Sequence, residues 1–296
     1  MQEKTLIIGP LPPPYHGVAV MVKWLIEGLR KRNGFDFIHL NTQDPKKSKN
    51  FGKFTLRNSW FALKNIFRLF KCLMKEKIEV VYIPISQEFW CFLRDSIFVL
   101  IARLLFRKRI VVHLHGGYFK IFYHQNSRLV KKYINFVFKY VSRGIVLGHC
   151  LKSLLEDVLP QDKIDVVYNG IDTSPFEKTN ITKSKNGKFR LLFAGVLDES
   201  KGFFDLIKAI PTVTRYYPDI EVSIAGRWED DRLKNQVTTY IRDNELQDKV
   251  RFVGVVTGEE KRKLFKNSDT FVLPTYFYLE GQPVVILEAM AAGLPV

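Results

Sequence analysis

The feature that most constrains this chain is a repeated alternation between short apolar runs and longer stretches of helical period. The apolar runs have the length of buried strands, and the stretches between them place apolar residues on one helix face. This alternation is typical of βαβ units, in which helices cover both faces of a parallel sheet. The sequence therefore predicts an α/β protein with doubly wound parallel sheets.

The alternation runs in two series, which the polar stretch EKTNITKSKNGK at 177–188 separates. That stretch has neither apolar content nor a period, so we expect a linker there. We expect it to join an N-terminal domain, 1–176, to a C-terminal domain, 189–296, because 296 residues suit two cores better than one. The expected strands are 5–9, 35–40, 80–84, 110–115, 144–148 and 165–170, then 190–195, 221–226, 251–256 and 270–275.

The net positive charge of the chain comes entirely from its first part. Residues 1–170 hold 28 Lys+Arg and 12 Asp+Glu, a net of +16, whereas residues 171–296 hold 18 of each, a net of zero. A field of this size attracts an acidic membrane, a nucleic acid or a phosphorylated substrate. Solubility alone would predict charge spread over both parts.

The cellular compartment follows from the cysteines and the apolar runs. The three cysteines, Cys72, Cys91 and Cys150, fit no disulfide or zinc spacing and indicate reduced thiols in a cytosolic protein. The N-terminus has too short an apolar run for a signal peptide. Charged residues interrupt the apolar region 89–106, so we expect a buried helix there, not a membrane span.

The segment 59–77 has the clearest amphipathic pattern. Its basic residues recur at helical spacing, and a bulky apolar face lies beside them. Two interpretations stay open: a helix lying on an anionic bilayer, or a core-facing helix with a solvated basic side. The basic residues are Lys64, Arg68, Lys71 and Lys75, and the apolar residues are Trp60, Leu63, Phe67, Phe70 and Met74.

Two features of the first domain are candidate site residues. Gly17 follows the first strand in GPLPPPYHG and lets backbone N–H groups approach an anion, although a structural turn is equally compatible. His113 and His115 alternate along a strand and point to one side. We expect His115 to bind substrate at the strand's carboxyl end and His113 to be structural; a zinc site is the alternative, without an evident third ligand.

The second domain adds a lysine and two glutamates. Lys201, before Gly202 at an expected helix start, can neutralise a diphosphate. In EGQPVVILEAMAAGLPV, Gly281 permits an unusual backbone geometry and Pro283 suits a first helical turn. Glu280 would lie at the mouth of that helix, and Glu288 inside it could accept two vicinal hydroxyls or a structural hydrogen bond.

These motifs resemble those of the retaining glycosyltransferases of family 4, the "group 1" transferases. The residues that carry the resemblance are Glu280 and Glu288 in an E-x7-E arrangement, preceded by HLHGG, VVYNGIDTSPF and FAGVLDESKGFFDLIKAI. The resemblance implies a GT-B architecture: two Rossmann-like domains facing each other across a cleft. The N-terminal domain would take the acceptor and the C-terminal one the nucleotide-sugar.

The resemblance also implies a role for each candidate residue. Lys201 would bind the donor diphosphate, Glu288 the ribose hydroxyls, and Glu280 the donor sugar. Gly17 would pass close to the phosphates, and His115 would contact the sugar. The backbone amides beside Glu280 would belong to the donor site; they are those of Gly281, Gln282, Pro283 and Val284, of which the proline supplies no N–H.

The same resemblance implies the substrates and the place of action. The donor would be a UDP- or GDP-sugar, with no cofactor and no metal ion. The acceptor would be a glycan or a polyprenyl-diphosphate-linked sugar in capsule, O-antigen or exopolysaccharide synthesis, reached at the inner face of the cytoplasmic membrane. Val196 stands where the family often has arginine, which removes one expected cation from the diphosphate site.

Other functions remain open on the sequence alone. A GT-B epimerase or phosphorylase shares the motifs, and a nucleic-acid-binding module would explain the charge but not the two glutamates. The family's second domain normally continues beyond GLPV, so we also expect the C-terminal sheet to lack its closing elements.

Overall fold

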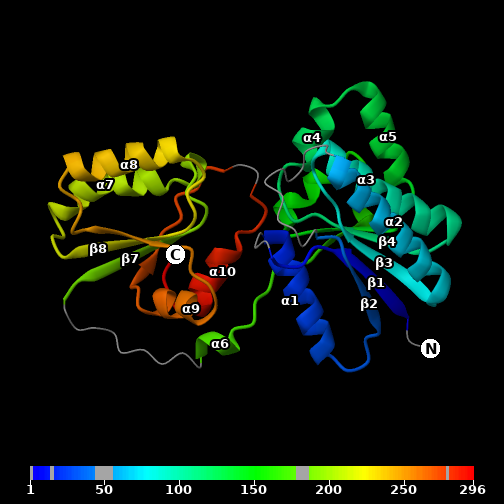
Figure 1. Ribbon diagram of the computed structural model, residues 1–296, viewed down its shortest axis with the longest axis horizontal. Helices are drawn as coiled ribbons and strands as arrows, with labels where there is room; N and C mark the ends of the chain where they lie inside the picture. Colours follow the sequence, from blue (N-terminus) through cyan, green and yellow to red (C-terminus); the bar gives the residue numbers. More distant parts are fainter. Residues whose placement is uncertain (1–2, 14–16, 44–55, 178–186, 278–279) are drawn as a thin grey trace. The chain divides into compact units, whose positions relative to one another are not determined.

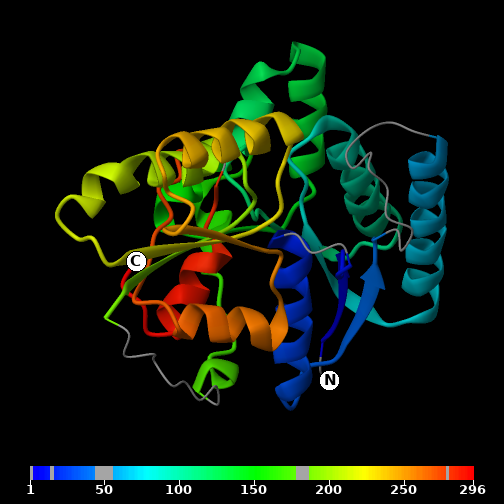
Figure 2. The same cartoon turned by 60° about the vertical axis from the view of Figure 1, so that its left-hand side comes forward.

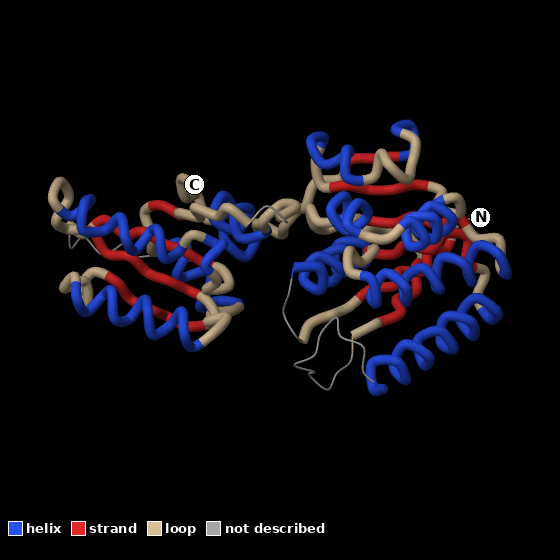
Figure 3. The backbone as a smooth tube through the Cα atoms, turned by 90° about the horizontal axis from the view of Figure 1, so that it is seen from above, coloured by secondary structure: helices blue, strands red, loops and turns tan. Residues whose placement is uncertain are grey.

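A computed structural model describes residues 3–13, 17–43, 56–177, 187–277 and 280–296. The chain divides into two compact units, each with one parallel sheet (Figure 3). Unit 1 takes Met1–Asn169 together with the short segment Leu279–Gln282, and unit 2 takes Gly170–Tyr278 and Pro283–Val296. Most of the predicted linker, residues 178–186, lies outside the described residues.

Six parallel strands form the sheet of unit 1, in the order β2-β1-β3-β4-β5-β6. The strands are β1 (Lys4–Gly9), β2 (Phe37–Asn41), β3 (Ile78–Pro84), β4 (Arg109–His113), β5 (Arg143–Val146) and β6 (Ile164–Val166). The main helices are α1 (Gly17–Lys31), α2 (Leu56–Lys75), α3 (Phe89–Leu100), which continues into a π-helical turn η1 (Ile101–Leu105), α4 (Phe119–Gln125) and α5 (Arg128–Phe138).

The sheet of unit 1 has helices on both faces, as the alternation predicts. Neighbouring residues of β1 point to opposite sides: Leu6 joins the large core under α2 and α3, whereas Ile7 packs against Val22 and Ile26 of α1. Figures 1 and 2 show α1 and α2 on opposite sides of these strands. Such a sheet gathers the carboxyl ends of all its strands at one edge, where ligands of doubly wound proteins bind.

Unit 2 repeats the plan with four parallel strands in the order β10-β7-β8-β9. Its strands are β7 (Phe189–Ala194), β8 (Ile220–Ala225), β9 (Val250–Gly254) and β10 (Thr270–Phe271). Its helices are α6 (Ser174–Glu177), α7 (Phe203–Thr214), α8 (Asp231–Asp243), α9 (Gly258–Lys266) and α10 (Val284–Ala291), with a 3-10 turn η4 (Glu199–Lys201) before α7. The helices α7 and α8 cover one face of the sheet, and α9 and α10 cover the other (Figures 1 and 2).

All ten predicted strands are present; several are one residue shorter than predicted, and two are reduced to three residues or fewer. The run predicted over 165–170 pairs only as far as Val166, and that over 270–275 forms two strand residues, Thr270 and Phe271. In the second run Pro274 lacks the N–H that a ladder needs, so the chain leaves the sheet. In the first, Asn169 hydrogen-bonds to Gln282 instead of to a strand.

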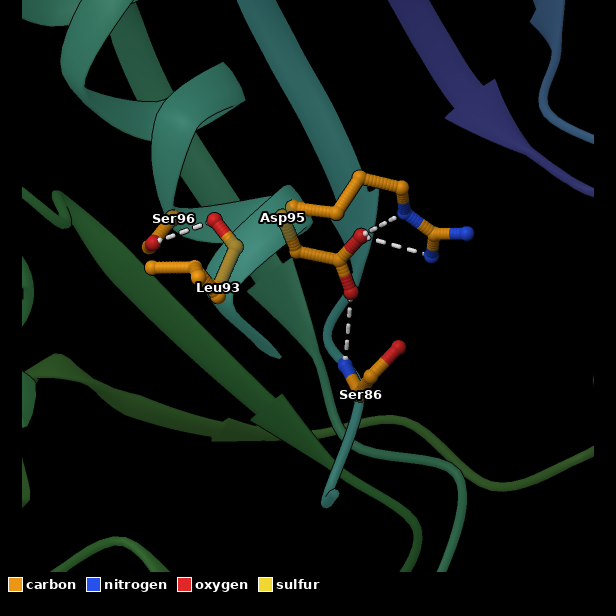
Figure 4. Close-up of polar contacts among 5 residues, drawn as sticks. Ser86, Leu93, Asp95 and Ser96 are labelled. Atoms are coloured by element: carbon orange, nitrogen blue, oxygen red, sulfur yellow. Dashed lines mark hydrogen bonds and ion pairs between the residues drawn. The ribbon is translucent and has the colours of Figure 1, made fainter. Parts of the chain in front are cut away.

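The apolar region 89–106 is a helix of unit 1, and its buried charge fastens the loop after β3. The Asp95 side chain is buried and accepts a hydrogen bond from the backbone N–H of Ser86 at 2.9 Å (Figure 4). Arg94 supplies the countercharge, with Nε 2.9 Å and Nη2 2.7 Å from Oδ1 of Asp95. A charge buried in this way needs such partners. Among the described helices, none is long and apolar enough to cross a membrane.

Candidate functional site

Two histidines with neighbouring, tilted rings stand at the carboxyl end of β4. The ring centroids of His113 and His115 are 4.0 Å apart, which confirms that both side chains point to one side of the strand. The hydroxyl of Tyr82 on β3 lies 2.6 Å from Nδ1 of His113 and 3.5 Å from Nε2 of His115. The sequence pattern did not single out Tyr82, because VVYIP has the composition of any buried strand.

Burial keeps both histidines neutral at pH 7. Desolvation lowers the pKa of His115 to about 4, and desolvation together with the neighbouring His115 lowers the pKa of His113 to about 2. Each ring has one buried nitrogen without a hydrogen-bond partner among the residues that the structure describes, Nε2 of His113 and Nδ1 of His115. Within the described residues, no three His, Cys, Asp or Glu side chains are grouped as a metal site would require. The pair therefore offers neutral hydrogen-bonding groups.

The segment that carries Glu280 packs in unit 1 against the loop after β4. A Cβ atom added to Gly281 would lie 3.0 Å from the carbonyl oxygen of His115 and 3.3 Å from Cα of Gly116. Gly281 does not take a positive φ, so the expectation of an unusual backbone geometry is wrong. The glycine is needed because two backbones approach closely, and this approach brings the loops of Glu280 and His115 together.

Lys201 lies where the sequence predicts it, at the start of a helix after β7. It closes the turn η4, and Gly202 follows with φ of +73° before α7 begins at Phe203. The ammonium group of Lys201 lies 4.2 Å from the ring centroid of Phe277, in the loop after β10. The loops that follow β7 and β10 thus meet at this lysine, where helix α7 presents its positive end.

Glu288 has a partner that the sequence pattern did not identify. Nζ of Lys261 on α9 lies 2.8 Å from Oε1 and 2.6 Å from Oε2 of Glu288. The Glu288 side chain is 12% exposed and that of Lys261 30%, so the ion pair is partly shielded from water. Lysine is common in helices, so its spacing alone could not reveal this contact. The two contacts hold the carboxylate in one orientation.

The helix that carries Glu288 begins one residue later than predicted. Pro283 has φ of −63° and ψ of 117° and stands just before α10, not within its first turn. Val284 is therefore the first helical residue. The helix ends at Ala291, and the predicted stop, Gly293, follows the C-cap residue Ala292 with φ of +79°; the backbone N–H of Leu294 donates to the carbonyl of Ala289 at 3.0 Å.

Gly17 is the remaining predicted donor residue, and Val196 is the position where the sequence lacks the family's arginine. Gly17 is the first residue of α1, and a Cβ atom there would meet no described atom within 4 Å. Packing among the described residues therefore does not account for glycine at this position. Val196 is exposed at the end of β7, and its side chain offers no charge there.

Helix α2 exposes the apolar face that the sequence predicts. Leu69 and Leu73 on its opposite side are buried in the core of unit 1. The exposed fractions of the outward side chains range from 39% to 72%, so the core-facing interpretation of this face is wrong. We define the outer face of α2 as Trp60, Leu63, Phe67, Phe70 and Met74. An exposed apolar patch of this kind marks an interaction surface.

Comparison with known proteins identifies two family models along the chain. Residues 15–175 match the model described as "Glycosyltransferase Family 4". Residues 176–296 match the model described as "Glycosyl transferases group 1". Together the two matches cover both units.

Curated relatives are similar over part of their own length. The UDP-Gal:alpha-D-GlcNAc-diphosphoundecaprenol alpha-1,3-galactosyltransferase of Escherichia coli is 30% identical over 251 residues, which is 79% of this chain and 60% of that protein. The amylovoran biosynthesis glycosyltransferase AmsK of Erwinia amylovora is 33% identical over 141 residues, 46% of this chain and 34% of that protein. The matched regions of these two relatives thus span less than two thirds of each.

Solved structures share the fold. Anabaena HepE in complex with UDP and glucose has a TM-score of 0.67 at 16% identity, covering 99% of this chain and 80% of that one. The lipopolysaccharide outer core galactosyltransferase WaaB, in its apo form, has a TM-score of 0.63 at 17% identity, covering 99% and 79%. The expected GT-B fold is therefore confirmed, with a second sheet of four strands among the described residues.

Proposed function

This chain belongs to glycosyltransferase family 4, and from that we propose that it moves a sugar from a nucleotide-sugar to a glycan or lipid-linked acceptor with retention of anomeric configuration. The observation that carries the proposal is the closing stretch, in which Glu280 lies in the loop before α10 and Glu288 lies inside it, held by Lys261. The pathway would be the synthesis of a surface polysaccharide.

The donor would be a UDP- or GDP-sugar bound mainly by unit 2. Lys201 would face the diphosphate together with the first N–H groups of α7, because anions bind at helix N-termini. Glu288, oriented by Lys261, would accept hydrogen bonds from the ribose hydroxyls. The N–H groups of residues 281, 282 and 284 would line the approach to α10, and Gly17 would leave room for the phosphates.

The chemistry would depend on Glu280 as an electrostatic stabiliser. As the bond between the anomeric carbon and the diphosphate breaks, positive charge develops on the sugar ring, and a nearby carboxylate stabilises it. The acceptor oxygen then bonds to the anomeric carbon on the same face, and its proton passes to the departing phosphate oxygen. His115 is neutral at pH 7, so it would hold the sugar by a hydrogen bond and not by charge.

The acceptor would be carried at the inner face of the cytoplasmic membrane, with unit 1 against an anionic bilayer. The outer face of α2 supplies exposed aromatic side chains for the interfacial region. The basic residues Lys64, Arg68, Lys71 and Lys75 flank it on the same helix, and the net +16 of residues 1–170 adds attraction to anionic lipid. The E. coli relative, whose name includes a diphosphoundecaprenol-linked sugar, supports this choice.

One assay tests the proposal against its alternatives. Purified protein is first screened by thermal shift with UDP- and GDP-sugars, and the sugars that stabilise it are then incubated with and without a polyprenyl-diphosphate-linked acceptor. We expect consumption of the nucleotide-sugar that rises with the acceptor. Interconversion of nucleotide-sugars without an acceptor would indicate an epimerase, and the absence of any stabilising nucleotide-sugar would contradict the proposal.

A further inference from the structure

Two hydrogen bonds join Asn169 to Gln282, although 113 positions separate them in the chain. The backbone N–H of Asn169 donates to Oε1 of Gln282 at 2.7 Å, and Nδ2 of Asn169 donates to the backbone carbonyl of Gln282 at 3.2 Å. Asn169 is 9% exposed, so water competes little for these bonds. The side chain and backbone of each residue take part, which fixes their relative orientation.

These residues occupy equivalent places along the chain. Asn169 is the last residue of unit 1 before Gly170 begins unit 2, and Gln282 is the last residue of unit 1 before Pro283 returns to unit 2. Gln282 precedes a proline, which restricts its backbone to extended conformations. The two hydrogen bonds therefore hold the carboxyl end of the segment that carries Glu280.

The preceding residue of that segment is held as well. Gly281 lies against the backbone of His115 and Gly116, so two consecutive residues after Glu280 have fixed neighbours in unit 1. The close approach at Gly281 is a steric contact and tolerates sliding, whereas the hydrogen bonds of Asn169 are directional. The side-chain amide of Asn169 thus fixes the position of Gln282, the last residue of the segment.

Packing alone does not explain why an asparagine occupies position 169. Its Oδ1 is buried and has no hydrogen-bond partner among the described residues. An unpaired buried acceptor is unfavourable, and an apolar side chain would avoid it. The residue is nevertheless suited to one task, because only Nδ2 can donate to the carbonyl of Gln282.

We propose that Asn169 is a positioning residue that acts through Gln282 to hold the loop of Glu280 in its working place. The inference rests on the proposed role of Glu280 in glycosyl transfer. Lys201 and Glu288 belong to unit 2 and keep their own contacts when this pair is broken. Loss of the bond from Nδ2 of Asn169 leaves the backbone bond of residue 169 but frees the Gln282 carbonyl, and therefore affects the step that needs Glu280 and spares nucleotide binding.

The experiment compares Asn169→Ala and Asn169→Asp with the control Asn135→Ala. Asn169→Asp keeps the shape of the side chain but removes the donor, and Asn135 makes a similar partly buried bond from Nδ2 to the hydroxyl of Tyr123 at 3.0 Å. Hydrogen exchange is followed in peptides that contain the amides of 281, 282 and 284. Turnover of the nucleotide-sugar and the Kd of its free nucleotide are measured in parallel.

We expect both Asn169 variants to exchange these amides about tenfold faster and to lose about tenfold or more in kcat, with the Kd of the free nucleotide within about twofold of wild type. The control should change neither exchange nor kcat. Unchanged exchange in the Asn169 variants, or raised exchange with unchanged kcat, would overturn the inference. If wild-type protein consumes no nucleotide-sugar, the proposed function fails, and the exchange data still decide whether Asn169 holds the segment.

Discussion

Lys261 on α9 holds both carboxylate oxygens of Glu288 on α10, at 2.8 and 2.6 Å from its Nζ. The contact gives Glu288 a structural role in unit 2 and, at the same time, the fixed orientation that a hydroxyl-binding carboxylate needs. The structural and the nucleotide-binding roles predict different consequences for nucleotide affinity when the carboxylate alone is changed.

We predict that Glu288→Gln weakens binding of the free nucleotide about tenfold or more. A carboxylate accepts from two vicinal hydroxyls, whereas the amide offers one acceptor, and a hydrogen bond to a charged group contributes roughly 1.5–3 kcal/mol. Isothermal titration with UDP and GDP measures the effect. Glu259→Gln is the matched control, because Glu259 pairs with Lys263 on the exposed side of α9. Equal affinities in the two variants would restrict Glu288 to its structural role.

The turn before α7 should be intolerant of any side chain at Gly202. Gly202 has φ of +73°, and a Cβ atom there would lie 2.1 Å from the carbonyl oxygen of Pro274. Gly254 has nearly the same φ, +72°, with no described atom within 4 Å of an added Cβ. We predict that both substitutions to alanine lose about 1 kcal/mol to backbone strain, and that Gly202→Ala loses a further 1–3 kcal/mol, roughly, to overlap. Urea unfolding of the two variants measures the difference, and equal losses would contradict it.

The stability of unit 1 should fall as the pH drops below about 6.5. The pKa of His115 is lowered to about 4 and that of His113 to about 2, so the folded state excludes protons that the unfolded state binds. Their contribution is complete above the unfolded pKa and is lost as the pH falls toward the folded values. By pH 5 each histidine should account for about 2 kcal/mol of lost stability.

Urea midpoints at pH 7 and pH 5 test this dependence on the buried histidines. We expect His115→Gln to reduce the difference between the two midpoints. His149→Gln, a change at an exposed position, should leave the difference as in wild type. A wild-type midpoint that is the same at both pH values would show that these rings do not titrate on unfolding.

Sedimentation with vesicles tests the outer face of α2. We predict that reversing Lys64, Arg68, Lys71 and Lys75 to glutamate abolishes binding to vesicles rich in phosphatidylglycerol at 0.1 M salt, because each basic residue near the surface contributes about 1 kcal/mol. The control variant has the same change in total charge on and beside helix α5, where four basic residues are replaced by glutamate: Arg128, Lys131, Lys132 and Lys139. Equal loss in both variants would indicate general charge attraction and no defined membrane face.

Much of this fold could be predicted from periodicity. The strands could be predicted because each apolar run is long enough to be buried, and the α2 helix because its apolar residues recur at helical spacing. In β1, for example, Leu6 and Ile7 lie in the cores on opposite faces of the sheet. The shortening of β10 could not be predicted from the apolar pattern, because Pro274 ends the pairing of this edge strand. The start of α10 at Val284 could not be predicted either, because a proline is compatible both with the first helical turn and with the position before it. The direction of the apolar face of α2 was also open, since a pattern does not say which face meets a core.

The site could be predicted only where a single residue type carries the chemistry. Lys201 stands at a helix start, His115 follows a strand end, Glu288 lies inside a helix that follows a proline, and all three are recognisable in the sequence. Tyr82 and Lys261 are not, because each acts through a partner on another element, and no local spacing encodes that contact. The glycine at 281 could be noticed, but its reason, close approach to His115, depends on tertiary packing.

The central claim is that Glu280 stabilises the transition state of glycosyl transfer, and Glu280→Gln tests it most directly. The measurement is steady-state transfer from the identified nucleotide-sugar to the lipid-linked acceptor, with nucleotide Kd from titration of the same preparation. The account predicts a fall in kcat of about a hundredfold or more with the Kd nearly unchanged. Wild-type kcat in the variant would contradict it.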